Sequence, residues 1–208
     1  MIVRAQQAAL TRVDRDAAAT KSLFETLAAG PLPHWDEFAS VVQLRQVEAG
    51  GTVFMQGAEH PFVYVVRRGL VKNLYLRDDG ESWIKSFSTE GRFFASIAAL
   101  KSGGRTSFTA NCIEDSELER IPFDVIERYA TSDVTWSNVL RKAIMIFAER
   151  KEQRERELLV LDPEQRYRAL LGEQPELARR ATQKDLAAYI GVTPVGLNRI
   201  VKRVRNVR

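Results

Sequence analysis

Residues 182–205 place the strongest constraint on how this chain of 208 residues can fold. Their sequence, TQKDLAAYIGVTPVGLNRIVKRVR, contains two short runs of helical periodicity that separate at Gly191. Glycine at this point can adopt the left-handed conformation that ends the first helix. Thr193 and Pro194 suit the cap and the first residue of the second helix, and the small Ala187 lets the two helices cross closely. Together these residues predict a helix-turn-helix.

The second predicted helix has two distinct faces. Its apolar stripe comprises Leu197, Ile200, Val201 and Val204. Its other face presents Val195, Asn198, Arg199, Lys202, Arg203 and Arg205. An amide and several cations that start at a helix N-terminus suit the base edges and flanking phosphates of the DNA major groove. We expect Thr182, Gln183 and Lys184 to contact phosphates. The plainer alternative is a helical hairpin with a basic surface.

The distribution of charge agrees with a polyanionic partner for this end of the chain. Residues 161–208 contain ten Lys and Arg against five Asp and Glu, whereas the remaining residues contain 21 against 22. The whole basic excess therefore lies at the C-terminal end, although a charge run by itself is often only a solvated face.

A β-rich region precedes the helices. Short runs rich in Val, Phe, Tyr and Ile occur at residues 52–55, 62–66, 70–76, 82–88, 107–113 and 116–121, with glycines between many of them. This rhythm predicts an all-β barrel or sandwich. Asp78-Asp79-Gly80 predicts a hairpin turn. Two short helices are expected before it, at residues 21–29 and 34–41.

Helical periodicity returns between Asp133 and Leu161 and predicts one long helix. At about 42 Å, this helix is longer than the β region needs as cover, which favours a two-helix dimer seam over packing within its own domain. The expected seam residues are Trp136, Val139, Leu140, Ala143, Ile146 and Phe147. Asp162, Pro163 and Gln165 then predict a capped helix start, so a hinge is expected near Leu161. We therefore divide the chain at residues 1–131, 132–161 and 162–208.

The β segment of residues 50–96, GGTVFMQGAEHPFVYVVRRGLVKNLYLRDDGESWIKSFSTEGRFFAS, the long helix and the TQKDLAAYIGVTP run resemble, in this order, the Crp/Fnr family. The resemblance implies an α+β fold: an N-terminal cyclic-nucleotide-binding-like β-roll (a double-stranded jelly roll), a long dimerisation helix and a C-terminal helix-turn-helix domain. It also implies a homodimeric, sequence-specific DNA-binding transcription regulator. Double-stranded DNA, a second copy of the chain and RNA polymerase are the candidate partners.

The resemblance also assigns roles within the second helix. Arg199 falls where the family has a base-reading arginine, whereas Val195 replaces the usual glutamate and favours contact with a thymine methyl group. The target sequence is therefore expected to differ from the family's best-known sites. Family members usually continue into a β-hairpin wing, and we expect the backbone contacts of that wing to be either absent here or replaced by the basic tail that ends at Arg208.

The family's cyclic-nucleotide pocket is only partly represented. Ala95-Ser96 stands in place of a Gly-Glu pair, so the carboxylate for the ribose is missing. Arg105-Thr106 resembles the phosphate-binding pair but falls one residue early, which can turn a strand side chain to the other face. Lys151-Glu152 occupies the step that reads adenine. These departures weigh against cyclic AMP and leave another small ligand, or none, open. The candidate effector-pocket residues are Ser96, Arg105 and Thr106.

Composition limits the other function classes. The single cysteine, Cys112, excludes an internal disulfide and an all-cysteine iron–sulfur cluster within one chain. His34 and His60 lack neighbours at metal-ligand spacing, so no metal or cofactor is expected. Without a phosphate-binding glycine loop or an activated nucleophile, an enzyme is not expected. Without a signal peptide or roughly 18 consecutive apolar residues, we expect a cytoplasmic protein away from membranes. One alternative stays open: a ligand-binding module whose helix-turn-helix serves protein interaction.

Overall fold

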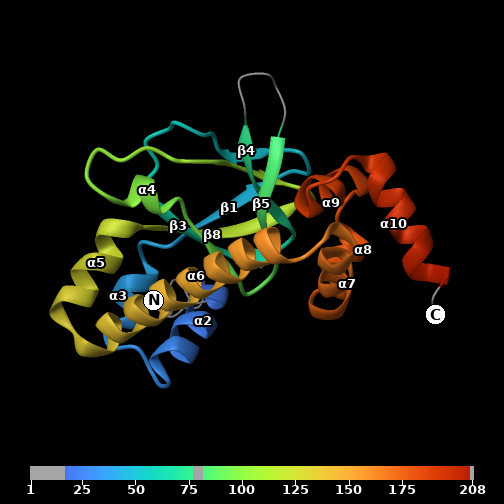
Figure 1. The fold of residues 1–208 in the computed structure, drawn as a ribbon. Helices are drawn as coiled ribbons and strands as arrows, with labels where there is room; N and C mark the ends of the chain where they lie inside the picture. Colours follow the sequence, from blue (N-terminus) through green and yellow to red (C-terminus); the bar gives the residue numbers. More distant parts are fainter. Residues whose placement is uncertain (1–16, 77–81, 207–208) are drawn as a thin grey trace, which may run out of the picture.

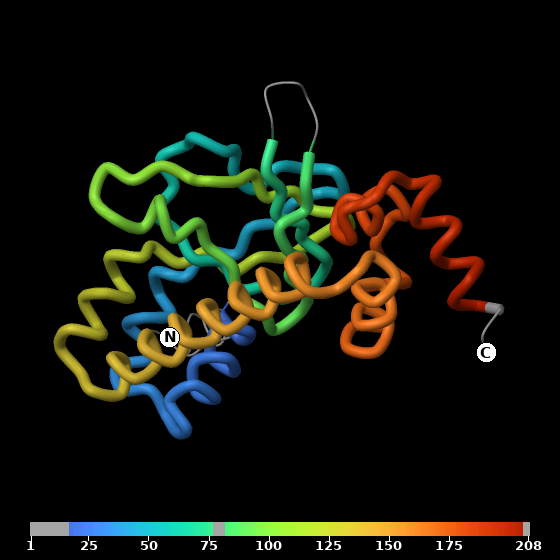
Figure 2. The backbone as a smooth tube through the Cα atoms, viewed as in Figure 1, coloured from blue at the N-terminus to red at the C-terminus, as the bar shows by residue number. Residues whose placement is uncertain are grey.

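The structure is a computed structural model that describes residues 17–76 and 82–206. A β-roll occupies the centre, with helices against one side and at one end (Figure 1). The helices before and after the roll are α2 (Ala18–Ala28), α3 (Trp35–Ala39), α5 (Phe123–Ser132), α6 (Val134–Val160), α7 (Pro163–Glu173), α8 (Pro175–Arg180), α9 (Gln183–Ile190) and α10 (Pro194–Asn206). Helix α6 runs along the roll from α5 to the C-terminal helices, as the tube in Figure 2 shows. Among the described residues, no helix combines the length and apolarity that crossing a bilayer requires.

The roll consists of two four-stranded antiparallel sheets. One has the order β1-β8-β3-β6 and the other β2-β7-β4-β5. The strands are β1 (Gln43–Val47), β2 (Thr52–Phe54), β3 (Phe62–Arg68), β4 (Val71–Leu76), β5 (Ser82–Ser88), β6 (Phe93–Phe94), β7 (Thr109–Cys112) and β8 (Ser116–Pro122), with the short helix α4 (Ile97–Leu100) after β6. The predicted jelly roll is confirmed. Strands β4 and β5 pair as expected, and Asp78-Asp79-Gly80 lies outside the described residues.

Strand β3 is buried on both faces, which explains why its sequence lacks polar alternation. Tyr64 and Val66 point into the core between the two sheets. Val63 and Val65 point the other way and pack in a second core with residues of α2, α3, α5 and α6. A strand covered on both sides reads as a continuous apolar run, so FVYVV is the sequence of a central strand in a layered domain.

A buried carboxylate joins the roll to α2. Glu119 of β8 has no exposed surface, and its two oxygens accept hydrogen bonds from the amides of Ala19 (3.0 Å) and Thr20 (2.6 Å). These amides belong to the first turn of α2, whose N–H groups have no partners within the helix. Glu119 therefore acts as the N-terminal cap that the sequence around Ala17 does not supply.

Helix α6 has the predicted bounds, but its predicted dimer seam is wrong in part. Trp136 and Val139 are each 1% exposed and lie in the core that α6 shares with α2 and α3. Leu140, Ala143 and Ile146 are half-buried against the same core. The apolar stripe thus packs within the chain, and the exposed apolar residues in the middle of α6 are instead Ile144 (54%) and Met145 (51%).

Several elements were not predicted from the sequence, among them β1, β6, α5 and α8. Strand β1 has the exposure pattern of an edge, since only β8 pairs with it. An edge strand with one polar face and few buried side chains gives little hydrophobic alternation to detect. The predicted helix start after Leu161 is confirmed: α6 ends at Val160, and Asp162 and Gln165 form the capping box that starts α7. That this junction acts as a hinge stays a prediction.

Candidate nucleic-acid interface

The turn between α9 and α10 is made by the residues predicted from the sequence. Gly191 has φ +82° and ends α9, with its amide donating to the carbonyl of Ala187 at 2.9 Å. The hydroxyl of Thr193 accepts from the amide of Gly196 at 3.1 Å and so caps the start of α10. The Gly191 turn and the Thr193 cap, both local contacts with the backbone, therefore fix the angle between the two helices.

The inner faces of α9 and α10 form one apolar core with α7 and α8. Leu186, Ala187, Ile190, Leu197, Ile200 and Val204 are all buried there. Tyr167 and Leu170 of α7 and Leu177 of α8 complete this core. Because every apolar position of α10 except Pro194 and Val195 is turned inward or half-covered, its polar residues are left on the outer face.

The outer face of α10 is an exposed, cationic surface. Val195 is 62% exposed, and the other predicted DNA-contacting residues of this helix, Asn198, Arg199, Lys202 and Arg203, are also exposed. Arg203 donates to Glu164 of α7 at 2.8 Å. Arg203 and Arg168 hold the pKa of the Glu164 carboxyl below its ordinary value through their hydrogen bonds. In the described part of the chain, Arg199 and Lys202 form no ion pair, so their charges are available to an anionic partner.

The start of α9 lies next to this surface in the chain and is solvent-accessible. Thr182, Gln183 and Lys184 are exposed. Thr182 caps α9 by accepting from the amide of Asp185 at 3.1 Å. The amides of a helix N-terminus favour anions, so this end of α9 and the outer face of α10 offer two kinds of contact with a polyanion.

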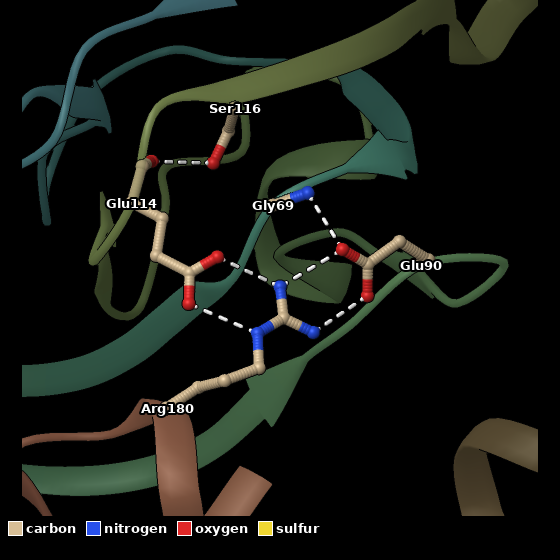
Figure 3. A network of polar contacts seen from close by, with 5 residues as sticks. All are labelled: Gly69, Glu90, Glu114, Ser116 and Arg180. Carbon is tan, nitrogen blue, oxygen red and sulfur yellow. Dashed lines mark hydrogen bonds and ion pairs between the residues drawn. The ribbon is translucent and has the colours of Figure 1, made fainter. Parts of the chain in front are cut away.

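The C-terminal helices are docked on the β-roll by a network that the sequence did not reveal (Figure 3). Arg180, at the end of α8, lies between two carboxylates of the roll. It donates to Glu114 at 2.9 and 2.8 Å and to Glu90 at 2.8 and 2.8 Å. Glu90 also accepts from the amide of Gly69 at 2.8 Å. The hydrogen bonds from Arg180 lower the pKa of Glu90 to about 2.

A second polar contact and an apolar patch extend this docking. Lys72 of β4 forms a 2.7 Å ion pair with Asp185 of α9. Leu70, which is fully buried, packs in the core of the C-terminal helices instead of the core of the roll. Phe87 of β5 lies 5.3 Å from Tyr189 of α9 between ring centroids. The helix-turn-helix is therefore held in one orientation relative to the β-roll.

Known regulatory proteins are similar to this chain over most of its length. Residues 44–133 match the cyclic nucleotide-binding domain family. The fumarate and nitrate reduction regulatory protein of Salmonella typhi is 23% identical over 184 residues, which cover 81% of this chain and 71% of that protein. Regulatory protein HlyX of Actinobacillus pleuropneumoniae is 24% identical over 176 residues, covering 76% and 70%.

The structure of FixK2 from Bradyrhizobium japonicum superposes with a TM-score of 0.70 at 21% identity and covers 80% of this chain and 85% of that one. A structure of the catabolite activator protein of Thermus thermophilus gives a TM-score of 0.52, covering 86% of both chains. The chain is therefore similar to regulators of the Crp/Fnr family over about four fifths of its length. The resemblance predicted from the order of its parts is confirmed.

The residues expected to form an effector pocket are hydrogen-bonded to other groups of the chain itself. Arg105 is largely exposed and donates to the Gly57 carbonyl (2.9 Å) and to Glu59 (2.8 Å). Thr106 donates to the carbonyl of Met55 and accepts from the amide of Ala58. Ser96 accepts from the amide of Ser107 at 2.9 Å. Their polar groups hold the loops of the roll together, and their role in an effector pocket remains a prediction.

The sequence did not indicate that Arg180, Glu90 and Glu114 act together. Arg180 was only one of several cations in the basic C-terminal region, and its two partners are 90 and 66 positions away in the chain. No local spacing connects them. Within residues 17–76 and 82–206, no three His, Cys, Asp or Glu side chains gather as a metal site would require.

Proposed function

We propose that this chain is a homodimeric transcription regulator of the Crp/Fnr type that binds DNA in a sequence-specific manner through α10, and that it acts in the cytoplasm. The observation that carries the proposal is the outer face of α10, where Asn198, Arg199 and Lys202 are exposed beside a capped turn of helix-turn-helix geometry. Such a helix places its N-terminal residues at base edges in the major groove. In this proposal, residues 132–161 join a sensor domain to a DNA-binding domain that starts at residue 162.

Arg199 is the proposed base reader and Lys202 a proposed phosphate contact. An arginine suits the paired acceptors of guanine, whereas the exposed Val195 can contact a thymine methyl group. Thr182, Gln183 and Lys184 would hold the flanking backbone. This division of roles predicts different consequences for substitution, because base contacts carry the specificity and phosphate contacts carry the salt dependence.

Selection of bound DNA from a random pool with the full chain tests the proposal. We expect a palindrome whose half-sites lie about one helical turn, roughly 34 Å, apart. Arg199→Ala should weaken binding to that site about 10- to 100-fold, the usual effect of losing one bidentate base contact. Arg128→Ala, which removes an exposed cation from α5, is the matched control and should leave binding unchanged.

A second selection with Val195→Glu tests which base this position reads. A glutamate can accept from the amino group of cytosine, so the preferred base at one position of each half-site should change. Recovery of no common sequence by the unaltered chain would contradict DNA recognition. Regulation that survives Arg199→Ala would instead favour the alternative in which the helix-turn-helix contacts a protein.

The proposed dimer uses the exposed side of α6. Ile144 and Met145 are about half exposed, and Ala148 and Leu159 continue the same side of the helix. Unpartnered apolar residues at helical spacing suit a second, equivalent helix. Met145→Glu should convert a dimer into a monomer in sedimentation at micromolar concentration, whereas Lys142→Glu, a half-buried position on the same helix, should have a smaller effect. A monomeric unaltered chain would contradict this part of the proposal.

A further inference from the structure

Glu164, in the first turn of α7, binds two arginines of the C-terminal helices at once. Its Oε1 atom accepts from Nε and Nη2 of Arg168 at 3.3 and 2.9 Å. Its Oε2 atom accepts from Nε of Arg203 at 2.8 Å. Arg168 lies one turn further along α7, whereas Arg203 belongs to the last turn of α10. We call Glu164, Arg168 and Arg203 the α7–α10 cluster.

The start of α7 fixes the position of the Glu164 carboxylate. Asp162 and Gln165 close a capping box there, so the backbone of this turn is held at both ends. The amides of a helix N-terminus favour a negative charge in the first turn. Hydrogen bonds from Arg203 and Arg168 also lower the pKa of the Glu164 carboxyl. The cluster is therefore built on an ionised carboxylate at neutral pH.

The α7–α10 cluster is not what holds α7 against α10. Apolar side chains of both helices already share a buried core. The side chains of the cluster are much more accessible, at 60% for Arg203, 44% for Arg168 and 29% for Glu164. Ion pairs with this exposure contribute little to the stability of a fold. The arrangement therefore points to a role in binding.

Both arginines keep N–H groups for another acceptor. Arg203 bonds through Nε alone, and its two Nη atoms have no partner within residues 17–76 and 82–206. The Nη1 atom of Arg168 has none in the same part of the chain. A guanidinium presents five N–H groups in a planar fork, a shape that matches phosphate. With a carboxylate on one edge of each fork, the rest of the fork is left for a second anion.

The α7–α10 cluster continues the proposed DNA-binding face of α10. Arg203 follows Arg199 by four residues, and residues at this spacing lie on the same side of a helix. From Val195 to Arg203 the helix rises by about 12 Å, and the major groove is about 12 Å wide. A helix whose N-terminal residues reach the base edges therefore has Arg203 close to the phosphates that border the groove.

From these observations we infer that the α7–α10 cluster binds a phosphate of the DNA backbone. Arg203 and Arg168 are the contacting residues, and Glu164 is the positioning residue. Two cations and one carboxylate leave the cluster with a net positive charge. The carboxylate holds both long side chains before DNA arrives, so less rotamer entropy is lost on binding. Continuity with Arg199 favours DNA over an acidic protein. This phosphate contact rests on the proposed DNA-binding function and adds α7 to the DNA-contacting surface.

The salt dependence of DNA binding by the full chain tests the two contacts. Fluorescence anisotropy measures affinity for the duplex selected from the random pool and for a duplex of unrelated sequence. Arg203→Met and Arg168→Met should each lower the slope of log K against log salt by about 0.9, the change for one phosphate contact. Affinity for both duplexes should fall by similar factors, since phosphate contacts carry no sequence information.

Arg179→Met is the matched control for these two variants. Arg179 is 69% exposed, belongs to the same group of C-terminal helices and pairs with a glutamate of its own helix, Glu176. Its removal changes the net charge by the same amount as the removal of Arg168 or Arg203. The salt slope of this variant should equal that of the unaltered chain.

Glu164→Gln separates positioning from simple repulsion. A carboxylate that only repelled DNA would tighten binding when removed. A positioning carboxylate predicts weaker binding to the selected duplex, by about 3- to 10-fold, the usual cost of immobilising a long side chain. The measurement is made at about 0.2 M salt, where long-range repulsion is largely screened. Arg203→Met should also cost less affinity in the Glu164→Gln background than in the unaltered chain, because the two residues act together.

Unchanged salt slopes in both arginine variants would overturn the inference. So would tighter binding by Glu164→Gln, or additive effects of Glu164→Gln and Arg203→Met. Loss of regulation in Arg203→Met with unchanged DNA binding would mean that the cluster contacts an acidic protein, which also overturns it.

Arg199→Ala separates failure of this inference from failure of the proposed function. If Arg199→Ala weakens binding to the selected duplex and the cluster variants do not, DNA recognition stands and the phosphate contact falls. If selection recovers no common sequence, sequence-specific recognition falls. The salt slopes on the unrelated duplex then still decide for or against the cluster, because phosphate contacts set that slope on any sequence.

Discussion

Arg180 is the residue whose removal most directly tests how the helix-turn-helix is attached to the β-roll. It directs four hydrogen bonds at Glu90 and Glu114. Methionine at this position keeps much of the apolar stem and removes the guanidinium. We therefore expect Arg180→Met to loosen the docking of α8 and α9 on the roll without unfolding either part.

The expected loss of docking free energy follows from the geometry and the exposure of the three side chains. Both carboxylates bind the guanidinium with two bonds each, an arrangement stronger than a single contact. The side chains are 25% exposed for Arg180, 42% for Glu90 and 36% for Glu114. Water therefore screens the pairs, and we assign each about 1 kcal/mol, the upper end for exposed ion pairs. Loss of both costs about 2 kcal/mol, or about 30-fold in the docking equilibrium.

Hydrogen–deuterium exchange measures this equilibrium in the full chain. Peptides of α9 should exchange up to about 30-fold faster in Arg180→Met, because a helix that has lost its packing on the roll opens more often. Peptides from β3 and β8, in the centre of the other sheet, should be unchanged. The control is Arg179→Met: Arg179 is the preceding residue of α8 and is 69% exposed, and among the described residues it pairs only with Glu176 of the same helix.

Equal exchange in Arg180→Met and Arg179→Met would refute this reasoning. It would mean that Leu70 and the Phe87–Tyr189 contact hold the docked arrangement and that the ion pairs add nothing to it. Faster exchange in β3 and β8 as well would mean that Arg180 stabilises the whole chain and not the docking.

Two further predictions concern carboxylates. Because Arg180 holds the pKa of Glu90 at about 2, below its ordinary 4.5, acid favours the undocked form. The contribution of the Arg180–Glu90 ion pair to the docked form should be complete above pH 4.5 and should decline as the pH falls towards 2. Hydrogen exchange of α9 peptides, measured against pH, should show this dependence, and Arg180→Met should lack it. Glu119→Gln should lower the free energy of unfolding by about 2 kcal/mol in urea, since one of the amides of Ala19 and Thr20 then faces the NH2 group and loses its acceptor, and the other keeps only an uncharged one. A loss too small to measure would mean that water replaces that cap.

The turn of the helix-turn-helix could be predicted from the sequence because its determinants are local. Gly191 adopts the left-handed conformation that few other residues tolerate, and Thr193 caps the helix that begins at Pro194. The capping box of Asp162 and Gln165 is equally local. In each case the backbone groups and the side chains that satisfy them lie within a few residues of one another.

The packing partner of the long helix α6 could not be predicted from the sequence in this way. Its bounds follow from its periodicity, yet the stripe that contains Trp136 and Val139 packs against α2 and α3 of the same chain. Periodicity indicates that one face of a helix is covered. It does not indicate what covers it, because a neighbouring helix and a second subunit present the same apolar surface.

The sequence by itself determined the order of the parts, the β-roll and the outward residues of α10, since these depend on turn chemistry and on which side chains avoid water. Only the tertiary structure placed Arg180 between Glu90 and Glu114, and brought Arg203 of α10 to Glu164 of α7. Coulombic and hydrogen-bonding partners are chosen by distance in space. Residues from the roll and from the separate C-terminal helices come within that distance only when these parts have packed together.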